Sequence, residues 1–431
     1  MAITRRYFLK SGGLSLFGAG FVPSFLRRTA YALEQPRSSA RKKILVAVFQ
    51  RGAADGLNIV VPFGDKSYYP LRPSIAIPEP ASRSESSGQT AVDLDGFFGL
   101  HPSLAALKPL YDARQLAILH AAGSPDSTRS HFDAQDYMET ATLGSHATTD
   151  GWLNRYLETM PEAEATPFRA VAFSARMPRT LLGPAPALAL DDVRSFRLRA
   201  AGAGALPAIQ EGFEAMYASA SSALLDRTAQ EMFEAAATLE QVGAGEYQPA
   251  NGVEYPKGPL GKSLQQVAQL IKADVGLEVA FAEAPGWDHH VNEGGVQGQL
   301  ANNLKQFGDA LAAFHQDLGD RMADVVVLTM TEFGRTAREN GNRGTDHGHA
   351  SAMFVLGGPV KGGKVYGHWP GLDAGQLYEG RDLALTTDFR DVFAEVAARH
   401  LGVGQRDGIE ATSAIFPGFS VSSSRFRGFL G

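Results

Sequence analysis

Carboxylates and imidazoles gather in four short segments of this chain. Three of the segments directly follow an apolar run and the fourth precedes one. Their candidate ligands are Asp55, Asp288, His290, Glu332, Asp346 and His347. Carboxylate oxygens and imidazole nitrogens hold divalent cations such as zinc, magnesium, manganese or calcium. These residue types therefore predict a divalent-metal site, although they do not select the ion.

Each segment also has a structural alternative. Asp55 stands before Gly56 and could simply make a turn, because Asp-Gly is a common turn dipeptide. Asp346 could orient a neighbouring histidine instead of binding a metal. In extended backbone, alternate side chains share a face. We therefore expect His347 and His349 to point the same way, and only one of the adjacent His289 and His290 to accompany Asp288.

A fifth segment places a hydroxyl at the expected start of a helix. Ser130 precedes a helical pattern over His131–Leu143. A serine there could be a nucleophile beside backbone N–H groups that bind an anion. It could equally be a helix cap, because Asp133 follows three residues later, as in a capping box. Both roles stay open for Ser130.

Strands must position these residues. Ile44–Phe49 is a continuous apolar run of strand length, which is typical of a strand buried on both faces. Similar runs lie at Leu116–His120, Ala170–Phe173, Leu277–Phe281, Val325–Met330 and Ala352–Leu356.

Helical patterns alternate with these strands, at His131–Leu143, Ile209–Val242, Leu260–Val275, Gln297–Leu318 and Phe389–Leu401. The alternation predicts an α/β fold with a largely parallel central sheet sandwiched by helices. Ligands of such sheets bind outside the carboxyl ends of the strands, which is where three of the segments fall.

The first 32 residues differ from the rest of the chain. They contain adjacent Arg5 and Arg6, an apolar run over Gly13–Phe25 and the small-x-small triplet Ala30-Tyr31-Ala32. This order predicts a twin-arginine signal peptide over residues 1–32, read by the twin-arginine translocase and by signal peptidase. We expect a periplasmic or secreted protein with no transmembrane segment in its mature chain. Residues 33–431 then form one α/β domain with a helical insertion at about 200–250.

Composition excludes other classes of protein. The chain has no cysteine, which rules out disulfides, thiolate metal ligands and cysteine nucleophiles. The leader carries five basic residues and no acidic residue, so the remainder has 35 basic and 46 acidic residues and a net charge of −11. An acidic body is a poor surface for phosphate neutralisation, and we expect no nucleic-acid partner.

At its motifs the sequence resembles a bacterial family known as domain of unknown function 1501, within the alkaline phosphatase and sulfatase-like superfamily. The resemblance rests on segments in the same order along the mature chain: Ala54–Asn58, Arg129–Asp133, Gly286–Asp288 with His290, Thr331–Arg335, Gly344–Gly348 and Thr387–Phe393. It implies an alkaline phosphatase-like α/β fold.

The resemblance also implies roles for individual residues. Asp55 matches the superfamily's early metal ligand, and Ser130 matches its nucleophile. Asp288, His290 and His347 match the ligands of one metal, while Glu332 stands near an Asp-His pair of the other. No histidine follows Glu332, so the second metal is one ligand short. Arg335 would hold an anionic ester through a bidentate contact.

Two functions follow from these observations. The first is an exported metal-dependent hydrolase of phosphate or sulfate esters, with Ser130 and Arg335 as catalytic residues and an anionic ester as substrate. The second is a non-catalytic periplasmic or cell-surface binding or assembly protein on the same scaffold, with an exported protein as its partner. The incomplete second metal set favours the second function.

Overall fold

The computed structural model describes residues 41–80, 89–144, 146–159, 166–193, 247–404 and 410–431, together with Thr238 and Val242. The chain divides into two compact units, one of Met1–Arg41 with Phe196–Gln241 and one of Lys42–Ser195 with Val242–Gly431. Every strand and helix given below belongs to the second unit. The predicted leader, and most of the predicted insertion and of the helix over Ile209–Val242, lie outside the described residues.

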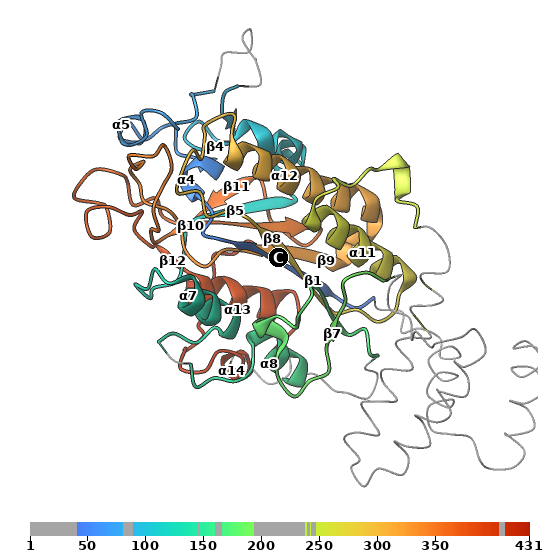
Figure 1. Cartoon of the computed structure of the whole chain (residues 1–431). Helices are drawn as coiled ribbons and strands as arrows, with labels where there is room; N and C mark the ends of the chain where they lie inside the picture. The colour runs from blue at the N-terminus through green and yellow to red at the C-terminus, as the bar shows by residue number, and fades with distance from the viewer. Residues whose placement is uncertain are drawn as a thin grey trace, which may run out of the picture. The chain divides into compact units, whose positions relative to one another are not determined.

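The centre of this unit is a nine-stranded sheet in the order β11-β5-β10-β9-β1-β8-β6-β7, with β12 paired to β5 (Figure 1). Its strands are β1 (Ile44–Arg51), β5 (Leu116–Gly123), β6 (Ala170–Phe173), β7 (Leu188–Ala189), β8 (Val279–Pro285), β9 (Val325–Met330), β10 (Ser351–Gly357), β11 (Lys364–Tyr366) and β12 (Thr387–Asp388). All neighbouring pairs in this sheet are parallel except the two that involve β10. The predicted α/β fold with a largely parallel sheet is confirmed.

The reversed direction of β10 matters for the site. Because β10 runs against β9 and β5, its first residue, Ser351, pairs with Ala122 near the carboxyl end of β5. The loop that precedes β10 therefore lies at the same edge of the sheet as the segments that follow β1, β5, β8 and β9. Five segments therefore lie at this edge: the four segments that the sequence singled out, and the start of the helix that follows β5.

Helices cover both faces of the sheet, with α11 and α12 on one face and α7, α8 and α13 on the other (Figure 1). The bounds of the helices are α4 (Gly56–Ile59), α5 (Tyr68–Leu71), α6 (Lys108–Asp112), α7 (His131–Thr140), α8 (Trp152–Thr159), α11 (Pro259–Ala273), α12 (Gln299–Leu318), α13 (Phe389–Arg399) and α14 (Glu410–Ser413). Short 3-10 helices lie at Pro102–Leu107, Arg179–Leu181, Ala250–Gly252, Gly319–Asp324 and Ser423–Arg425.

The strands are as apolar as a sheet covered on both faces requires. Seven of the eight residues of β1 are buried, between β8 on one side and β9 on the other. On one face Trp152 of α8 stacks on Phe393 of α13, with ring centroids 4.6 Å apart. On the other face Phe307 of α12 packs against Phe354 of β10. Burial on both faces makes this sheet a rigid support for the loops at its edge.

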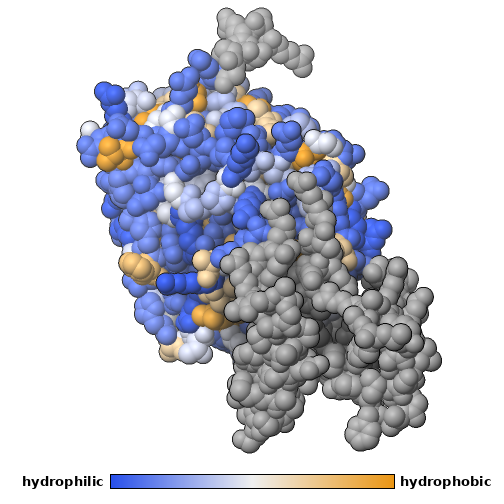
Figure 2. Space-filling model, turned by 45° about the vertical axis from the view of Figure 1, so that its right-hand side comes forward, coloured by the Kyte–Doolittle hydropathy of each residue, from blue (hydrophilic) through white to orange (hydrophobic). Residues whose placement is uncertain are grey.

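A smaller sheet of β2 (Val60–Val61), β4 (Gly99–Leu100) and β3 (Val92–Asp93) accompanies the main one. On the face drawn in Figure 2 the coloured surface is mostly hydrophilic, and its apolar spots are scattered. Among the described helices, none combines the length and the hydropathy needed to cross a membrane.

Candidate metal centre

Asp288 lies at the centre of a group of histidines. Its Oδ1 atom is 3.0 Å from Nε2 of His290 and 3.2 Å from Nε2 of His347. Its Oδ2 atom is 3.6 Å from Nε2 of His131. The two Nε2 atoms of His290 and His347 are 3.0 Å apart. The three imidazoles therefore present the same ring nitrogen to one carboxylate.

The other nitrogen of each ring has an acceptor behind it. Nδ1 of His131 lies 2.8 Å from Oε1 of Glu332. Nδ1 of His290 lies 3.1 Å from Oδ1 of Asp346, and Nδ1 of His347 lies 2.9 Å from the carbonyl oxygen of Arg129. In a neutral imidazole the proton then lies on Nδ1, and the lone pair of Nε2 points into the group.

This arrangement fits a bound divalent ion. Nε2 of His131 is buried and has no hydrogen-bond partner among the described residues. Lone pairs that face each other and a carboxylate repel unless a cation lies between them. In a tetrahedral site with bonds of about 2.05 Å the ligand atoms are about 3.3 Å apart, close to the 3.0–3.6 Å separations seen around Asp288. Ring nitrogens backed by carboxylates and carbonyls are also typical of metal-binding histidines.

Electrostatics keep the acceptors ionised. Burial by itself would raise the pKa of Asp288, but the Arg335 guanidinium and the three neighbouring imidazoles together outweigh burial, and the pKa is lowered. Burial would likewise raise the pKa of Glu332, yet the hydrogen bonds from His131 and Gln135 lower it overall. The hydrogen bond with Glu332 in turn raises the pKa of His131. The centre therefore holds two anionic carboxylates that attract a cation.

Close backbone packing fixes the loops that carry these side chains. Gly52 has φ +119°, and a Cβ there would lie 2.8 Å from the backbone nitrogen of Asp288. A Cβ on Gly348 would lie 2.3 Å from the carbonyl carbon of Arg335. Arg335 and His347 also form an antiparallel bridge, flanked by a hydrogen bond from Gly348 N to Gly334 O. The segment after β9 and the loop before β10 are thus held together through their backbones.

The structure places Asp55 in another contact. Both of its carboxylate oxygens accept hydrogen bonds from Arg72, and both side chains are almost fully buried. Burial raises and Arg72 lowers the pKa of Asp55, with a net lowering. Glu293, also buried, has a pKa raised well above its usual value by burial and by Asp55. The described contacts of Asp55 therefore belong to a buried ion pair and do not include the group around Asp288.

Two other predicted ligands stand behind the histidines. Oε1 of Glu332 accepts hydrogen bonds from Gly52 N at 2.9 Å and from Gln135 Nε2 at 2.8 Å, besides its contact with His131. Asp346 accepts a hydrogen bond from Asn340 at 3.0 Å on the oxygen that faces His290. In this arrangement Glu332 and Asp346 orient imidazole rings, the alternative that the sequence left open for Asp346.

Arg335 is turned inward. Its side chain is fully buried and donates to the carbonyl oxygens of Ala53, Thr345 and Trp287, and to Oδ1 of Asp288 at 2.7 Å. Its guanidinium is therefore engaged within the protein and fixes Asp288, whereas the resemblance implies a contact with an anionic ester.

Ser130 lies at the start of α7, directly before His131. It has extended backbone, and its hydroxyl accepts a hydrogen bond from Asp133 N at 3.5 Å. The capping geometry that the sequence indicated is thus present. Ser130 also directly precedes His131, whose Nε2 atom faces Asp288.

The neighbouring histidines point elsewhere. Nε2 of His289 faces the Asn303 amide at 3.3 Å, and burial lowers the pKa of His289 to about 4. His349 stacks on Tyr378, with ring centroids 4.2 Å apart. The prediction that only one of the histidines after Asp288 accompanies it is confirmed, and that histidine is His290. The prediction that His349 shares the direction of His347 is wrong, because the backbone from His347 through Gly348 to His349 does not form a regular strand.

Sequence reasoning missed His131 as a ligand candidate. The helical pattern predicts that His131 begins a helix, and it gives no sign of a metal contact. One pattern pointed to it: His131 follows the apolar strand β5, as Asp288 follows β8. The role of Gln135, one helical turn later on α7, has no comparable pattern, because its contact with Glu332 depends on how α7 packs against the segment after β9.

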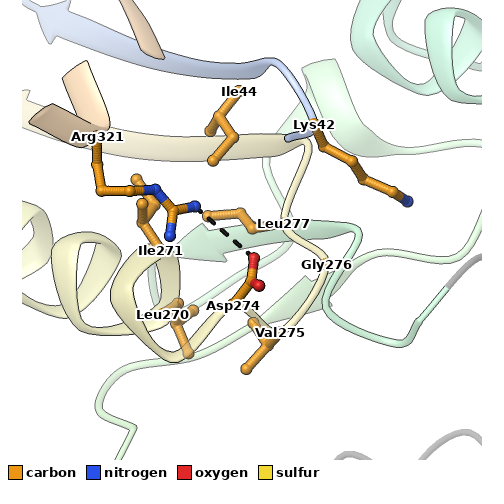
Figure 3. A pocket seen from close by; sticks show the side chains of 9 residues that line it. All are labelled: Lys42, Ile44, Leu270, Ile271, Asp274, Val275, Gly276, Leu277 and Arg321. Atoms are coloured by element: carbon orange, nitrogen blue, oxygen red, sulfur yellow. Dashed lines mark ion pairs between the residues drawn. The ribbon is translucent and has the colours of Figure 1, made fainter. Parts of the chain in front are cut away.

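Two cavities of the protein lie outside this group. The cavity in Figure 3, of about 30 Å³, is lined by Lys42, Ile44 and Arg321, among others, and lies at the amino ends of β1 and β9. Its ion pair joins Arg321 to Asp274 at 3.7 Å. A second cavity of about 110 Å³ lies between α11, α12 and Trp287. Because the first is at the opposite edge of the sheet, it is not part of the candidate centre.

Comparison with known proteins gives a family and several distant structural similarities, two of which are described here. A family model described as Protein of unknown function (DUF1501) matches residues 42–413. None of the curated proteins compared with the chain matches it. Among solved structures, the lipoteichoic acid synthase LtaP from Listeria monocytogenes is 11% identical with a TM-score of 0.37, over 88% of this chain and 76% of that one. The PsFucS1 sulfatase from Pseudoalteromonas sp. is 11% identical with a TM-score of 0.36, over 90% and 74%.

Proposed function

The chain belongs to the DUF1501 family of proteins of unknown function, and we propose that it is a metal-dependent hydrolase of phosphate or sulfate esters. The observation that carries this proposal is the convergence of Asp288, His290 and His347, with His131, at the carboxyl edge of the sheet. This edge is where open α/β sheets bind their ligands. The family description assigns no reaction, so the proposal rests on the site.

Each residue of the centre would have a separate role in the reaction. A divalent ion held there would polarise an ester oxygen and lower the pKa of a nearby hydroxyl. His290 and His347 supply ring nitrogens on one side of Asp288, and Asp346 and the Arg129 carbonyl hold their rings. Arg335 keeps the Asp288 carboxylate in place through its hydrogen bond to Oδ1.

We assign the nucleophile to Ser130. As its hydroxyl proton passes to a water molecule, Oγ would attack phosphorus or sulfur, the bond to the leaving oxygen would break, and the leaving alkoxide would take up that proton from the water. A second water would then hydrolyse the seryl ester and restore the hydroxyl. Support comes from the place of Ser130 at the start of the ten-residue helix α7, where backbone N–H groups favour anions.

We also retain export by the twin-arginine route as part of the proposal. It rests on the leader motif alone, because residues 1–32 lie outside the described part of the chain. Expression with the Arg5 and Arg6 pair replaced by lysines, followed by fractionation, tests it. We expect the precursor to stay in the cytoplasm, and export at the normal level would contradict the assignment.

The reaction is tested with the mature chain loaded with zinc or manganese and given 4-nitrophenyl phosphate and 4-nitrophenyl sulfate. We expect turnover of at least one ester and its loss in Asp288→Asn. Ser130→Asn is the sharper variant, because asparagine caps a helix as well as serine does but cannot form the covalent ester. A folded Ser130→Asn protein with the normal rate would remove Ser130 from the mechanism.

The binding or assembly protein remains the second candidate. Two observations favour it: Arg335 is engaged within the protein, and the Ser130 hydroxyl caps α7. A metal-loaded protein that turns over neither ester, but retains an exported partner after mild crosslinking, would support this function over the first.

A further inference from the structure

We propose that this centre holds a single metal ion and that His131 is a protein ligand of that ion, beside Asp288, His290 and His347. The inference deepens the proposed function, since it concerns the same centre. It departs from the superfamily resemblance, which implies two metals and gives His131 no role.

The position of His131 carries the first step. One ligand atom each of His131, Asp288 and His347 lie within 4.8 Å of one another, and Nε2 of His131 is 3.6 Å from Oδ2 of Asp288. The ring of His131 packs edge-on against that of His347, with centroids 4.4 Å apart, and Phe333 borders both rings. A buried nitrogen without a hydrogen-bond partner, aimed at a carboxylate and at a second imidazole, has the chemistry of a ligand and not of a surface histidine.

A chain of hydrogen bonds fixes which nitrogen of His131 faces inward. Arg51 can only donate, and its Nη1 lies 3.1 Å from Oε1 of Gln135. The amide nitrogen of Gln135 must then face Glu332, where it donates at 2.8 Å. Glu332 is therefore an acceptor throughout and takes the Nδ1 proton of His131. The side of the ring that is left for an ion is Nε2.

The carboxylates of a second site are engaged elsewhere. Both oxygens of Asp55 accept from Arg72. In Glu332, Oε1 accepts hydrogen bonds from Gly52, His131 and Gln135. Its other oxygen, Oε2, accepts a hydrogen bond from the Thr331 hydroxyl at 3.1 Å. Within the described residues, the group of acidic and histidine side chains whose ligand atoms all lie within 4.8 Å of one another contains His131, Asp288 and His347 and neither of these two carboxylates. His290 adjoins this group, with its Nε2 atom 3.0 Å from Oδ1 of Asp288 and 3.0 Å from Nε2 of His347. The donors therefore suffice for one ion.

The ligand chemistry also selects the class of ion. Three imidazoles and one carboxylate suit zinc and similar transition metals, whereas magnesium and calcium prefer oxygen ligands. Of the cations expected from the sequence, zinc therefore fits best and calcium least.

Metal stoichiometry tests the proposal without reference to activity. The mature chain is treated with chelator, dialysed, and titrated with Zn²⁺ and with Co²⁺ by calorimetry, with elemental analysis of the product. We expect one equivalent, and visible Co²⁺ bands with the high intensity of four- or five-coordinate sites. His131→Gln should weaken Co²⁺ binding more than 10-fold, while the matched control His349→Gln, whose ring lies on Tyr378, should bind as the normal protein does.

Two outcomes overturn the proposal: two tightly bound equivalents, or unchanged affinity and bands in folded His131→Gln. If that variant does not fold, Co²⁺ binding to the normal protein still tests the proposal. Weak octahedral Co²⁺ bands, or a second bound equivalent, would contradict a single ion held by these four ligands. One equivalent with His131 required, but without ester turnover, would contradict the proposed reaction and leave this ligand set standing.

Discussion

The Nε2 atoms of His290 and His347 lie 3.0 Å apart, with Oδ1 of Asp288 within 3.2 Å of both. Because an acceptor lies behind each Nδ1 atom, two lone pairs face each other here. A cation between them would remove the repulsion and would tie together the segment after β8 and the loop before β10. A metal bound here would therefore stabilise the fold as well as serve chemistry.

This relationship predicts that metal stabilises the fold. At a free ion concentration 100 times the Kd, binding to the native state alone adds about 2.7 kcal/mol to the free energy of unfolding. We expect Tm to rise when Zn²⁺ is added to the chelator-treated mature chain, and to stay constant in His347→Gln. Equal Tm values for the normal protein with and without Zn²⁺ would rule out a metal that links the segment after β8 to the loop before β10.

Gln135 should act on the metal through Glu332 and His131. Gln135→Leu keeps the volume and removes both hydrogen bonds, so we expect about 10-fold weaker Zn²⁺ binding, as for other residues behind a ligand. Unfolding free energy should fall by about 1 kcal/mol. The control is Gln265→Leu on α11, since no hydrogen bond joins Gln265 to the centre within the described part of the chain. Normal Zn²⁺ affinity in folded Gln135→Leu would show that its contacts serve stability alone.

Arg335 should affect stability more than substrate affinity. Arg335→Gln leaves buried carbonyl oxygens and the Asp288 carboxylate with fewer donors. Each buried acceptor that loses its donor costs about 1–3 kcal/mol, whereas the Asp288 side chain is 45% exposed and stays partly solvated. Denaturant unfolding of both proteins measures this difference. An unchanged unfolding free energy with a raised KM for an aryl ester would instead return Arg335 to the substrate-binding role that the family resemblance implies.

Buried histidines should make the protein less stable in mild acid. Burial lowers the pKa of His120 to about 4, and the ring is held neutral by Val60 O at 2.9 Å and Ala121 N at 2.8 Å. The unfolded chain binds this proton at about pH 6.5, so stability is full above that pH and is lost as pH falls towards 4. This group accounts for about 3 kcal/mol of the loss.

The check is the unfolding free energy at pH 7.5 and pH 5 for the normal protein and for His120→Asn. The variant should be less stable at pH 7.5 but lose less between the two pH values. His400, which is buried with a pKa lowered to about 4, provides a second test in His400→Asn. An equal pH dependence in all three proteins would contradict the assignment.

Gly348 should tolerate no side chain. An alanine Cβ would lie 2.3 Å from the Arg335 carbonyl carbon and would push the loop with His347 away from the segment after β9. We expect Gly348→Ala to lower the unfolding free energy by about 1–3 kcal/mol and to weaken metal binding. Gly375→Ala, where a Cβ meets open space, is the control. Equal Tm and Zn²⁺ affinity for both variants would show that the loop is not fixed by this contact.

The sequence by itself determined the α/β fold and the edge of the sheet at which chemistry gathers. The runs Ala170–Phe173 and Val325–Met330 are strands with the bounds that hydrophobicity predicts. It also indicated that Asp288 is accompanied by only one of the two histidines that follow it, because neighbouring side chains diverge. These features are local, since burial pattern and backbone alternation depend on residues close together in the chain.

The tertiary structure alone decided which side chains meet and in which roles. Asp55 pairs with Arg72, 17 residues later, and Arg335 turns to Asp288, 47 residues earlier. His131 reaches Glu332 across 201 residues because β5 and β9 both pair with the reversed strand β10. Contacts between distant residues follow from strand order and loop packing, and no spacing within one segment specifies them.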